Sequence, residues 1–480
     1  MSESAYDRLS ATDLVFLELE DGAITMHIGA VCVFEGAPLL GAREAFDMRR
    51  MRAFVAASLA GNPRFRQRLA YVPVLEHPVW VDDPDFDLGR HVHHARLPRP
   101  GGPRQLKRFA GDLMGARLPR DRPLWEMWFV DGLAGGRAAL IAKFHHCMID
   151  GISGVDILGA MLRLAPERRL APAPPWRPRP LPSGARLLAD ELARRAAAPL
   201  EALRGAGGWL RDPRHALEAA ATALHDLGAV GGATLGVASP TPLNVAVGPR
   251  RCFEWTRIDL AAVRAVKARL GGTVNDVVLT MLAGAVGRWL GDAGVDVAGL
   301  DFRLTMPASV RDAGEHGTLG NKVGVLTLPL PIAEPDPGRR LRAIVAATAA
   351  LKQSGQLHGV AMIAELSDRV FPPLAGWLAW IAARARTYNL SVTNVPGPQV
   401  PVYLLGARLE AIYPLAFLFS QQALTVAILS YDGALHWSLT GDPDVLPDLR
   451  PLLAATRDEL TGLQVAAGPR ARRRAAAPRP

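Results

Sequence analysis

Cysteine is scarce in this chain, and its scarcity excludes two classes of protein. The 480 residues hold three cysteines, Cys32, Cys147 and Cys252, far apart in the sequence. They form neither a disulfide framework nor a zinc-binding pattern, so the chain suits a reducing cytoplasm.

Metal-ligand patterns are also lacking. His91, His93 and His94 are close in sequence, but an extended chain would put His94 on the opposite face from the other two. No carboxylate or cysteine appears paired with them, and we therefore expect no metal site.

Long apolar runs are absent as well. No stretch reaches 18 apolar residues, so no transmembrane helix is predicted by length, and the polar, acidic residues 1–7 do not read as a signal peptide. The longest candidate, residues 371–383, is too short to span. Trp377 and Trp380, with arginines after them, suit either a segment in a membrane interface or an amphipathic helix packed on the core.

The charge is basic, with a net value of +9 and a pI near 9.9. Such a surface suits nucleic acid, anionic lipid or the phosphates of coenzyme A. The chain has no helix-turn-helix, zinc or RNA-binding signature, so we expect no nucleic-acid partner. Part of the excess charge lies in the Ala/Pro/Arg-rich residues 466–480, which we expect to be a disordered tail, either solvated or anchoring lipid.

Length and composition indicate a folded protein of two units. The chain is 49% hydrophobic and 21% charged, enough for a sizeable core. Residues 1–165 and 244–465 each read as a mixed α/β unit. Residues 166–243 form a connection between them, too rich in proline over 171–182 for a helix or central strand.

Periodicity and capping signals predict the main elements of both units. Helices are expected over residues 14–19, 43–60, 184–203, 215–227, 258–269 and 274–290. Strands are expected over residues 28–34, 86–94, 138–144, 323–330, 390–394, 423–430 and 434–440.

The most informative stretch is His145-His146-Cys147-Met148-Ile149-Asp150-Gly151. A hydrophobic strand runs into it and a helix-like run, residues 152–164, leaves it. A bare His-x-x-x-Asp is expected about 0.7 times by chance, but a preceding His and a following Gly make the match far rarer. Such a junction holds a side chain rigidly and still exposes it to substrate, which favours an enzyme with a histidine base. The alternative is a simple helix start with Asp150 as N-cap.

This motif and several others, in the same order, resemble the bacterial wax ester synthase/diacylglycerol acyltransferase family. The shared elements are Pro123-Leu124-Trp125, Asn275-Asp276 and Asn394-Val395-Pro396-Gly397-Pro398, with weaker matches at Leu9 to Asp13, Met306 to Arg311, Gly320 to Gly324 and Ser430 to Gly433. The resemblance covers roughly residues 5–460. It departs from the family at Cys147-Met148, where Ala-Leu is common, and in its longer tail.

The resemblance implies an α/β fold of two similar coenzyme-A-dependent acyltransferase domains, like chloramphenicol acetyltransferase. Each would carry a mixed sheet flanked by helices, with an active-site tunnel between the two. It implies acyl transfer from acyl-CoA to diacylglycerol or a long-chain alcohol, with acyl-CoA as substrate and no cofactor. The expected location is the cytoplasm, in peripheral contact with the inner membrane or lipid inclusions.

The resemblance and the spacing together assign roles at the motif. His146 is the expected base, since a neutral imidazole takes a proton near neutral pH. Asp150 either orients His146 or pairs with an arginine to shape the loop, and the resemblance favours the second. His145 is expected to shape the loop or the tunnel wall, and Gly151 allows the sharp turn. Cys147 is not expected to be a nucleophile, because its position tolerates alanine in the family.

The remaining elements receive supporting roles. Asn275, in the first turn of a helix, is the candidate donor to the oxyanion, and the alternative is that Asn275-Asp276 only caps that helix. The other elements are expected to be structural turns beside the tunnel: Pro123, Leu124, Trp125, Asn394, Pro396 and Gly397.

Two other functions stay open on the sequence. One is an acyltransferase of the same fold with a different acceptor, such as a polyketide-derived diol, a sugar or an amine. The other is a catalytically idle coat protein of lipid droplets.

Overall fold

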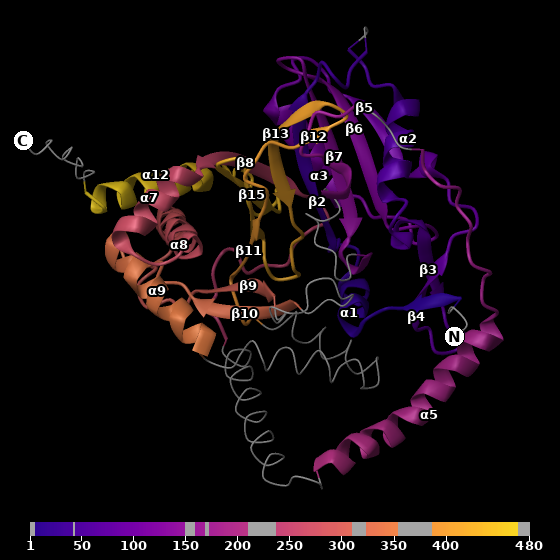
Figure 1. The fold of residues 1–480 in the computed structure, drawn as a ribbon. Coiled ribbons are helices and arrows are strands. Elements are labelled where there is room, and N and C mark those ends of the chain that lie inside the picture. Colours follow the sequence, from indigo (N-terminus) through magenta and orange to yellow (C-terminus); the bar gives the residue numbers. More distant parts are fainter. Residues whose placement is uncertain are drawn as a thin grey trace, which may run out of the picture.

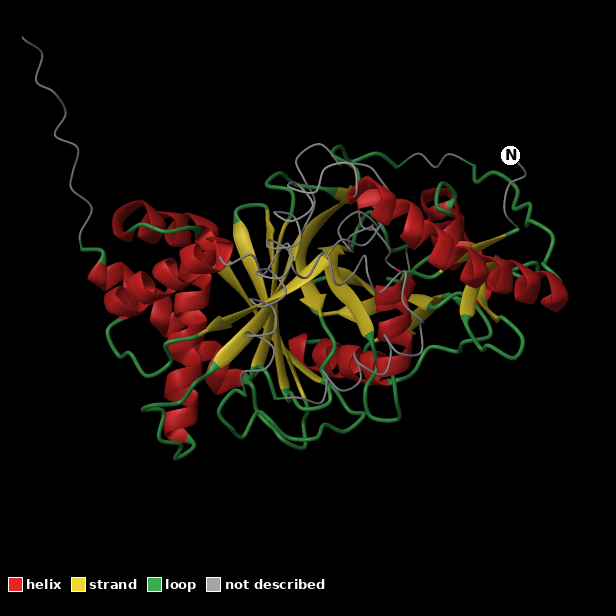
Figure 2. Ribbon diagram, turned by 90° about the horizontal axis from the view of Figure 1, so that it is seen from below, coloured by secondary structure: helices red, strands yellow, loops and turns green. Residues whose placement is uncertain are grey.

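The computed structural model describes residues 5–41, 44–148, 159–168, 172–209, 237–309, 323–353 and 386–468. Two large mixed sheets lie next to each other, and helices flank them on the outside (Figures 1 and 2). A third, small sheet lies at the edge of the N-terminal half.

The first large sheet has the strand order β12-β13-β2-β7-β6-β5. Its strands are β2 (His27–Glu35), β5 (Val92–Arg96), β6 (Trp125–Leu133), β7 (Arg137–His145), β12 (Tyr403–Leu404) and β13 (Ala407–Leu415). Only β5 and β6 are parallel neighbours. Two strands from the C-terminal part of the chain therefore complete a sheet built from N-terminal residues, and Figure 1 shows β13 beside β2.

The second large sheet has the strand order β10-β9-β11-β14-β15-β8. Its strands are β8 (Cys252–Asp259), β9 (Arg303–Ser309), β10 (Val323–Pro329), β11 (Leu390–Pro396), β14 (Leu424–Tyr431) and β15 (Ala434–Gly441). β11 runs parallel to β9 and β14. Four helices cover its outer face: α7 (Leu260–Leu270), α8 (Val274–Asp292), α9 (Pro337–Gln353) and α12 (Arg450–Ala466). Apolar side chains of α8, such as Val278 and Leu282, share one core with Val426 and Leu439 of the sheet.

The small sheet has the order β1-β4-β3. Its strands are β1 (Tyr6–Arg8), β3 (Gln67–Tyr71) and β4 (Pro78–Asp82). Residues 172–182, here called the strap, carry no regular structure and lead into the helix α5 (Gly184–Trp209). Leu187 at the start of α5 packs with Tyr6, Val79 and Val81 of this sheet. The connection between the halves is thus anchored to the N-terminal half.

The other elements lie around the first sheet. They are the helices α1 (Ala11–Leu19), α2 (Met48–Leu59) and α3 (Pro103–Gly115) and the 3-10 turns η1 (Pro63–Arg66), η2 (Leu88–Arg90) and η3 (His146–Met148). α3 packs on the sheet face that carries Val31 and Ile141, and it also contacts Phe253 and Trp255 of β8. The opposite face of the sheet carries Phe34 and belongs to a separate core.

Most predicted elements are confirmed, together with the mixed α/β fold. Local capping explains the helix starts: Ser10 accepts from the N–H of Asp13 at α1, and Thr273 accepts from that of Asp276 at α8. The strands predicted around residues 28–34, 138–144, 323–330, 390–394, 423–430 and 434–440 correspond to β2, β7, β10, β11, β14 and β15.

Several predicted boundaries are wrong: α1 begins at Ala11 and not at residue 14, and α5 continues to Trp209, beyond residue 203. The helix expected over residues 43–60 begins only at Met48, because Asp47 caps it. The helix expected from residue 258 begins at Leu260, since Ile258 still belongs to β8 and Asp259 is the N-cap. The strand expected over 86–94 is interrupted by η2, and β5 starts at Val92.

Several predictions fall outside the described residues. These are the helix over 215–227, the apolar segment 371–383, most of the helix-like run after Gly151, and the tail from residue 469. Within the described part of the chain, no single helix has both the length and the apolar character needed to cross a membrane. One bent pair, α7 with α8 at 99°, meets that test only when its two helices are taken together.

Candidate active site

The predicted base sits where β7 ends. Hydrogen bonds from neighbouring segments fix both motif histidines: the main-chain N–H of His145 donates to the carbonyl of Leu124 at 2.9 Å, and that of His146 donates to the carbonyl of Met26 at 2.8 Å. η3 begins at His146, so the chain turns directly after the strand. Asp150 and Gly151 lie outside the described residues.

Two phenylalanines from distant segments enclose the His146 ring. The ring of Phe16, from α1, lies 4.0 Å from it between centroids, and that of Phe417, after β13, lies 5.5 Å away at 85°. Nδ1 of His146 is buried and has no hydrogen-bond partner among the described residues. Burial lowers the pKa of His146 to about 4, while its own main-chain carbonyl acts more weakly in the opposite direction. The imidazole is therefore neutral near pH 7.

The side chain of His145 contacts a different set of residues from that of His146. Its Nδ1 accepts a hydrogen bond from the N–H of Cys147 at 3.2 Å, which places the ring proton on Nε2. That nitrogen faces Oε1 of Glu20 at 3.7 Å. Burial, and then the charge of Arg120, lower the pKa of His145 to about 3. His145 is thus a neutral, buried link between the motif and Glu20.

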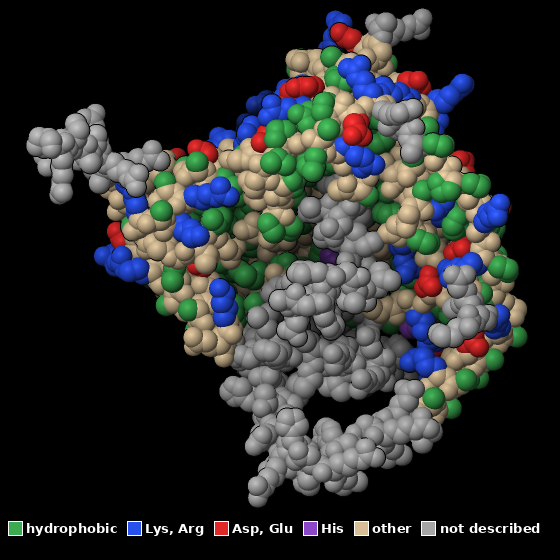
Figure 3. All heavy atoms as spheres, in the orientation of Figure 1, with side chains coloured by type: hydrophobic (Ala, Val, Ile, Leu, Met, Phe, Trp, Pro, Cys, Tyr) green, Lys and Arg blue, Asp and Glu red, His purple; other side chains and the backbone are tan. Residues whose placement is uncertain are grey.

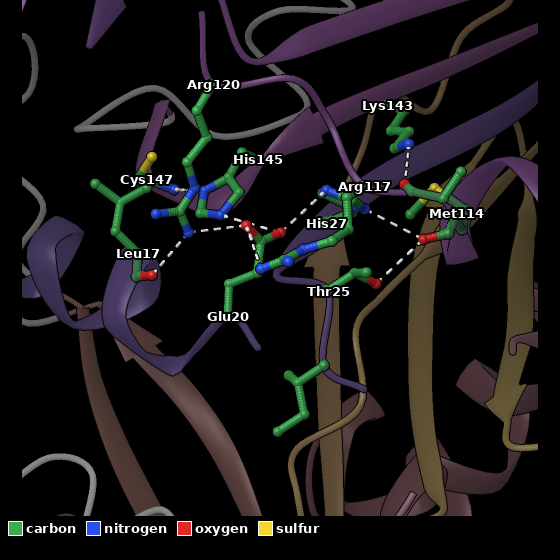
Figure 4. A network of polar contacts seen from close by, with 12 residues as sticks. Leu17, Glu20, Thr25, His27, Met114, Arg117, Arg120, Lys143, His145 and Cys147 are labelled. Atoms are coloured by element: carbon green, nitrogen blue, oxygen red, sulfur yellow. Dashed lines mark hydrogen bonds and ion pairs between the residues drawn. The ribbon is translucent and has the colours of Figure 1, made fainter. Parts of the chain in front are cut away.

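Glu20 lies at the centre of a buried polar network, shown in Figure 4. Its Oε2 accepts a hydrogen bond from Nη2 of Arg120 at 2.9 Å and lies 3.7 Å from Nη2 of Arg117. Arg120 also donates to the carbonyl of Leu17, near the C-terminal end of α1, at 3.0 Å. Oε1 lies 3.5 Å from Nε2 of His27. The carboxylate thereby joins α1, the loop after α3 and the end of β7.

The same network caps the C-terminal end of α3. Nζ of Lys143, two residues before His145 on β7, donates to the carbonyls of Leu113 at 2.8 Å and Ala116 at 2.5 Å. Nδ1 of His27 lies 3.2 Å from the carbonyl of Met114. Free carbonyls at a helix end attract such donors. Burial lowers the pKa of Lys143 to about 8. α3 is therefore fastened to the strand that carries the motif.

Cys147 has no reactive character in this setting. The side chain is fully buried, and burial raises the pKa of its thiol well above the ordinary value. The thiolate is the nucleophilic form, so a nucleophilic role at neutral pH is not supported.

The Pro-Leu-Trp element lies at the start of β6, next to the motif. The carbonyl of Leu124 is the acceptor for His145, and Leu124 itself is fully buried. Nε1 of Trp125 donates to the carbonyl of Phe65 at 2.9 Å. The main-chain N–H of Trp125 donates to the carbonyl of Pro123 at 2.9 Å, which turns the chain into the strand.

Asn275 and Asp276 occupy the first turn of α8 but make different contacts. Asp276 forms a capping box with Thr273, whose main-chain N–H donates to Oδ2 of Asp276 at 2.7 Å. The other carboxylate oxygen of Asp276, Oδ1, accepts a hydrogen bond from the hydroxyl of Thr348 at 2.8 Å. Oδ1 of Asn275 accepts a hydrogen bond from Nδ2 of Asn394 at 3.2 Å. The NH₂ group of Asn275 is not used in that bond. No contact between Asn275 and His146 is recorded within the described part of the chain.

The Asn-Val-Pro-Gly-Pro element closes β11. Pro396 is the last residue of the strand and lies opposite Ser430 of β14. The N–H of Gly397 donates to Oγ of Ser430 at 3.2 Å. A Cβ atom at Gly397 would come within 2.4 Å of the Ser430 carbonyl oxygen, so only glycine fits this approach. The motif therefore connects the strand end with Asn275 through Asn394.

A family model described as the wax ester synthase/diacylglycerol acyltransferase catalytic domain matches residues 9–278, and one described as the WS/DGAT C-terminal domain matches residues 319–464. The chain belongs to this family. A putative diacylglycerol O-acyltransferase of Mycobacterium tuberculosis is 32% identical over 460 residues, which covers 93% of this chain and 88% of that protein. A probable diacylglycerol O-acyltransferase of the same species is 31% identical, with 95% and 96% of the two chains covered.

Solved structures support the same assignment. A wax ester synthase/diacylglycerol acyltransferase from Marinobacter aquaeolei is 27% identical, with a TM-score of 0.66 over 96% of this chain and all of that one. The first condensation domain of the calcium-dependent antibiotic synthetase gives a TM-score of 0.60 at 16% identity, over 98% of both chains. The second likeness shows the fold alone. The protein is thus an acyltransferase of the WS/DGAT family with the two-domain fold of these enzymes.

One expectation about the histidines of β5 needs correction. No carboxylate partner was expected for them, but Nε2 of His94 lies 2.6 Å from Oδ2 of the buried Asp131. β5 runs parallel to β6 and aligns His94 with Phe129, two residues before Asp131. Arg96 also approaches Asp131, at 3.5 Å. Among the described residues, no group of three or more potential ligands is arranged to hold a metal ion.

Sequence reasoning missed the groups that surround the family's histidine motif. Phe16 and Glu20 belong to α1 and the loop after it, and neither forms part of a recognisable motif. Phe417 follows β13, a strand that was not predicted. Arg120 lies just before the Pro-Leu-Trp element, which was the one available hint of its position.

Proposed function

We propose that this protein transfers a long-chain acyl group from acyl-CoA to the hydroxyl of diacylglycerol or a fatty alcohol, with His146 as general base. The observation that carries the proposal is the state of His146: a neutral imidazole at a strand–turn junction, enclosed by Phe16 and Phe417. These apolar surroundings suit lipid substrates and would limit competition by water as acceptor. The names of the relatives support the acyltransferase class.

The reaction would proceed by direct attack. His146 takes the proton of the acceptor hydroxyl as its oxygen attacks the thioester carbonyl. The resulting tetrahedral oxyanion collapses, the carbon–sulfur bond breaks, and the proton passes from His146 to the departing thiolate of coenzyme A. The products are an ester and free coenzyme A, and no acyl-enzyme is needed.

Other motif residues would support this step. Asn275 would offer its NH₂ group to the oxyanion, because its carbonyl oxygen is already engaged by Asn394. Asp150 would shape the loop through an arginine, with Gly151 permitting the turn. His145 would hold the end of β7 through Glu20. Pro123, Leu124, Trp125, Asp276, Pro396 and Gly397 would keep the strand and helix ends in place.

The substrates suggest where the protein works. We propose a cytoplasmic protein in peripheral contact with the inner membrane or lipid inclusions, where diacylglycerol and long-chain alcohols reside. Basic and acidic side chains are interspersed on the face drawn in Figure 3, so the net positive charge is not gathered into one basic patch there. No metal or bound cofactor enters the proposed steps.

The test is release of free thiol from palmitoyl-CoA, with hexadecanol or dipalmitoylglycerol as acceptor. Wild type should release thiol only when an acceptor is present, and the better acceptor names the main product. His146→Ala should lower the rate by about a thousandfold, within the range of a lost general base. His93→Ala, on β5, is the matched control and should keep wild-type activity.

Each other outcome has a defined meaning. If His146→Ala keeps its activity, His146 is not the base. If wild type releases no thiol with either lipid, a diol, sugar or amine acceptor should be tried next. If none of these supports release, the reading as an idle lipid-droplet coat replaces the enzyme.

A further inference from the structure

A pocket of about 130 Å³ lies in the N-terminal half, between α2, η1, the start of β6 and the strap. Its wall is largely apolar and comes from segments far apart in the sequence. Among the lining residues are Val55, Leu59, Phe65, Trp125 and Pro174. Protein interiors are normally packed without a space of this size, so the pocket is an unusual feature of this half.

The pocket lies on the other side of the first large sheet from the Glu20 network. Trp125 lies directly opposite Phe144 in the antiparallel pair of β6 with β7, so both side chains project from one face of the sheet. His145 follows Phe144 and projects from the other face. The sheet itself therefore lies between the pocket and the Glu20 network.

The strap forms one side of the pocket and is anchored to the small sheet and the loop after it by hydrogen bonds. Nε1 of Trp176 donates to the carbonyl of Asp83 at 3.0 Å. Arg179 donates through Nη2 to Oδ1 of Asp82 at 2.8 Å and to Oδ2 of Asp7 at 3.1 Å. These bonds anchor the strap at the pocket and just after it, and Pro174 and Trp176 form part of the pocket wall.

One cation lines this pocket. The guanidinium carbon of Arg66 lies 4.2 Å from the ring centroid of Trp176, and Nη2 donates to the carbonyl of Ala60 at 2.6 Å. Nε is buried and has no hydrogen-bond partner among the described residues. The nearby carboxylate of Asp82 is engaged by Arg179. Arg66 therefore offers an unused N–H beside an apolar space.

We propose that this pocket binds a medium-chain carboxylate, with its alkyl chain against Trp125 and Leu59 and its carboxylate at Arg66. An apolar cavity of about 150 Å³ holds one benzene molecule, so the space suits about six carbons of a chain. A guanidinium with a free N–H is a natural partner for a carboxylate. Such a ligand satisfies both the apolar wall and the one unpaired polar group, which a plain hydrocarbon does not.

The experiment uses the full chain and 8-bromooctanoate, because bromine quenches the fluorescence of a tryptophan that it touches. Trp125 and Trp176 both line the pocket. Quenching should saturate in wild type, and octanoate should reverse it. Ala56→Phe, which fills the pocket from α2, should abolish the saturable part while acyl transfer stays unchanged.

A second variant tests the carboxylate contact. Arg66→Met should weaken octanoate binding about tenfold, as expected for one lost charge-assisted hydrogen bond, and should leave binding of 1-octanol unchanged. Circular dichroism would establish that both variants are folded.

The proposal fails if wild type shows no saturable quenching, or if folded Ala56→Phe is quenched like wild type. It also fails if palmitoyl-CoA displaces the probe with its own catalytic affinity, because the ligand then sits in the acyl-CoA site. Acyl transfer is measured separately, so these results leave the proposed function intact.

Discussion

Oε1 of Glu20 lies 3.7 Å from Nε2 of His145, although one residue follows the first helix and the other ends the central strand β7. The contact joins the family's histidine motif to the N-terminal segment that also supplies Phe16. Because the Glu20 side chain is buried and accepts from Arg120, its charge matters to the fold. The end of β7 therefore lies directly beside a buried charged group as well as within the sheet.

Glu20→Gln should lower the free energy of unfolding by about 1–2 kcal/mol. The substitution leaves the guanidinium of Arg120 without its anion, and the loss is moderated because that arginine remains partly in contact with water. Urea unfolding would measure the change. Glu18→Gln, on the exposed side of α1, is the control and should change stability by less than about 0.5 kcal/mol. Equal free energies of unfolding for the two variants would show that the Glu20 network contributes no net stability.

The acid limb of kcat/KM should report the unusual state of His146. Burial lowers the pKa of His146 to about 4, so the neutral base is fully present above pH 5 and is lost as the pH falls through 4. A free histidine would show this limb near 6.5. Rates measured from pH 4 to 8 with a saturating acceptor would locate it. A midpoint at 6.5 in the intact enzyme would mean that the ring is hydrated in solution.

Phe16→Ala should move that limb upward. The phenyl ring lies 4.0 Å from the imidazole, and its removal admits water beside His146, which raises the pKa toward the ordinary value. We expect a shift of about one pH unit in the acid limb of kcat/KM. Phe417→Leu keeps an apolar group against the same imidazole and should shift the limb much less. If both variants keep the wild-type midpoint, the two aromatic rings do not set the pKa.

Local signals explain what could be predicted from the sequence. A continuous apolar run that ends at the two motif histidines defines β7, and a Thr-x-x-Asp box defines the start of α8. The family motifs then indicated the acyltransferase class. These features depend on neighbours within a few residues, so they are readable without the fold.

Non-local pairing explains what could not be predicted. β13 pairs with β2 from the opposite end of the chain, and this pairing brings Phe417 to the side of His146. Glu20 has no signature of its own and gains its role only when α1 lies beside the end of β7. The contact of Asn394 with Asn275 likewise joins two motifs that are far apart in the sequence.

That contact allows the proposed oxyanion role of Asn275 to be tested. Asn275→Ala should lower kcat about a hundredfold or more with little change in KM, if its NH₂ group stabilises the transition state. Asn394→Ala removes only the partner that orients Asn275 and should cost less, about threefold to tenfold. Pre-steady-state thiol release for the two single variants and the double variant would separate the effects. If both variants lose the same small amount of kcat, the Asn275–Asn394 pair only links α8 to β11 and does not stabilise the oxyanion.

Buried histidines should make the fold sensitive to mild acid. Burial lowers the pKa of His145 to about 3, and that of both His146 and His436 to about 4, so these rings stay neutral in the folded protein while they titrate near 6.5 in the unfolded chain. Between pH 6.5 and 4 the unfolded state therefore binds more protons, and stability is full above 6.5 and falls as the pH drops. Each ring contributes up to about 1.4 kcal/mol per pH unit.

His436→Leu isolates one of these contributions away from the histidine motif. His436 is fully buried on β15, and burial is the main cause of its lowered pKa, so leucine removes a titrating group and keeps an apolar side chain in the core. Urea unfolding at pH 7 and at pH 5 should show a shallower loss of stability in the variant, by about 1–2 kcal/mol over the interval. The same loss in variant and wild type would mean that His436 is hydrated and titrates normally in the folded state.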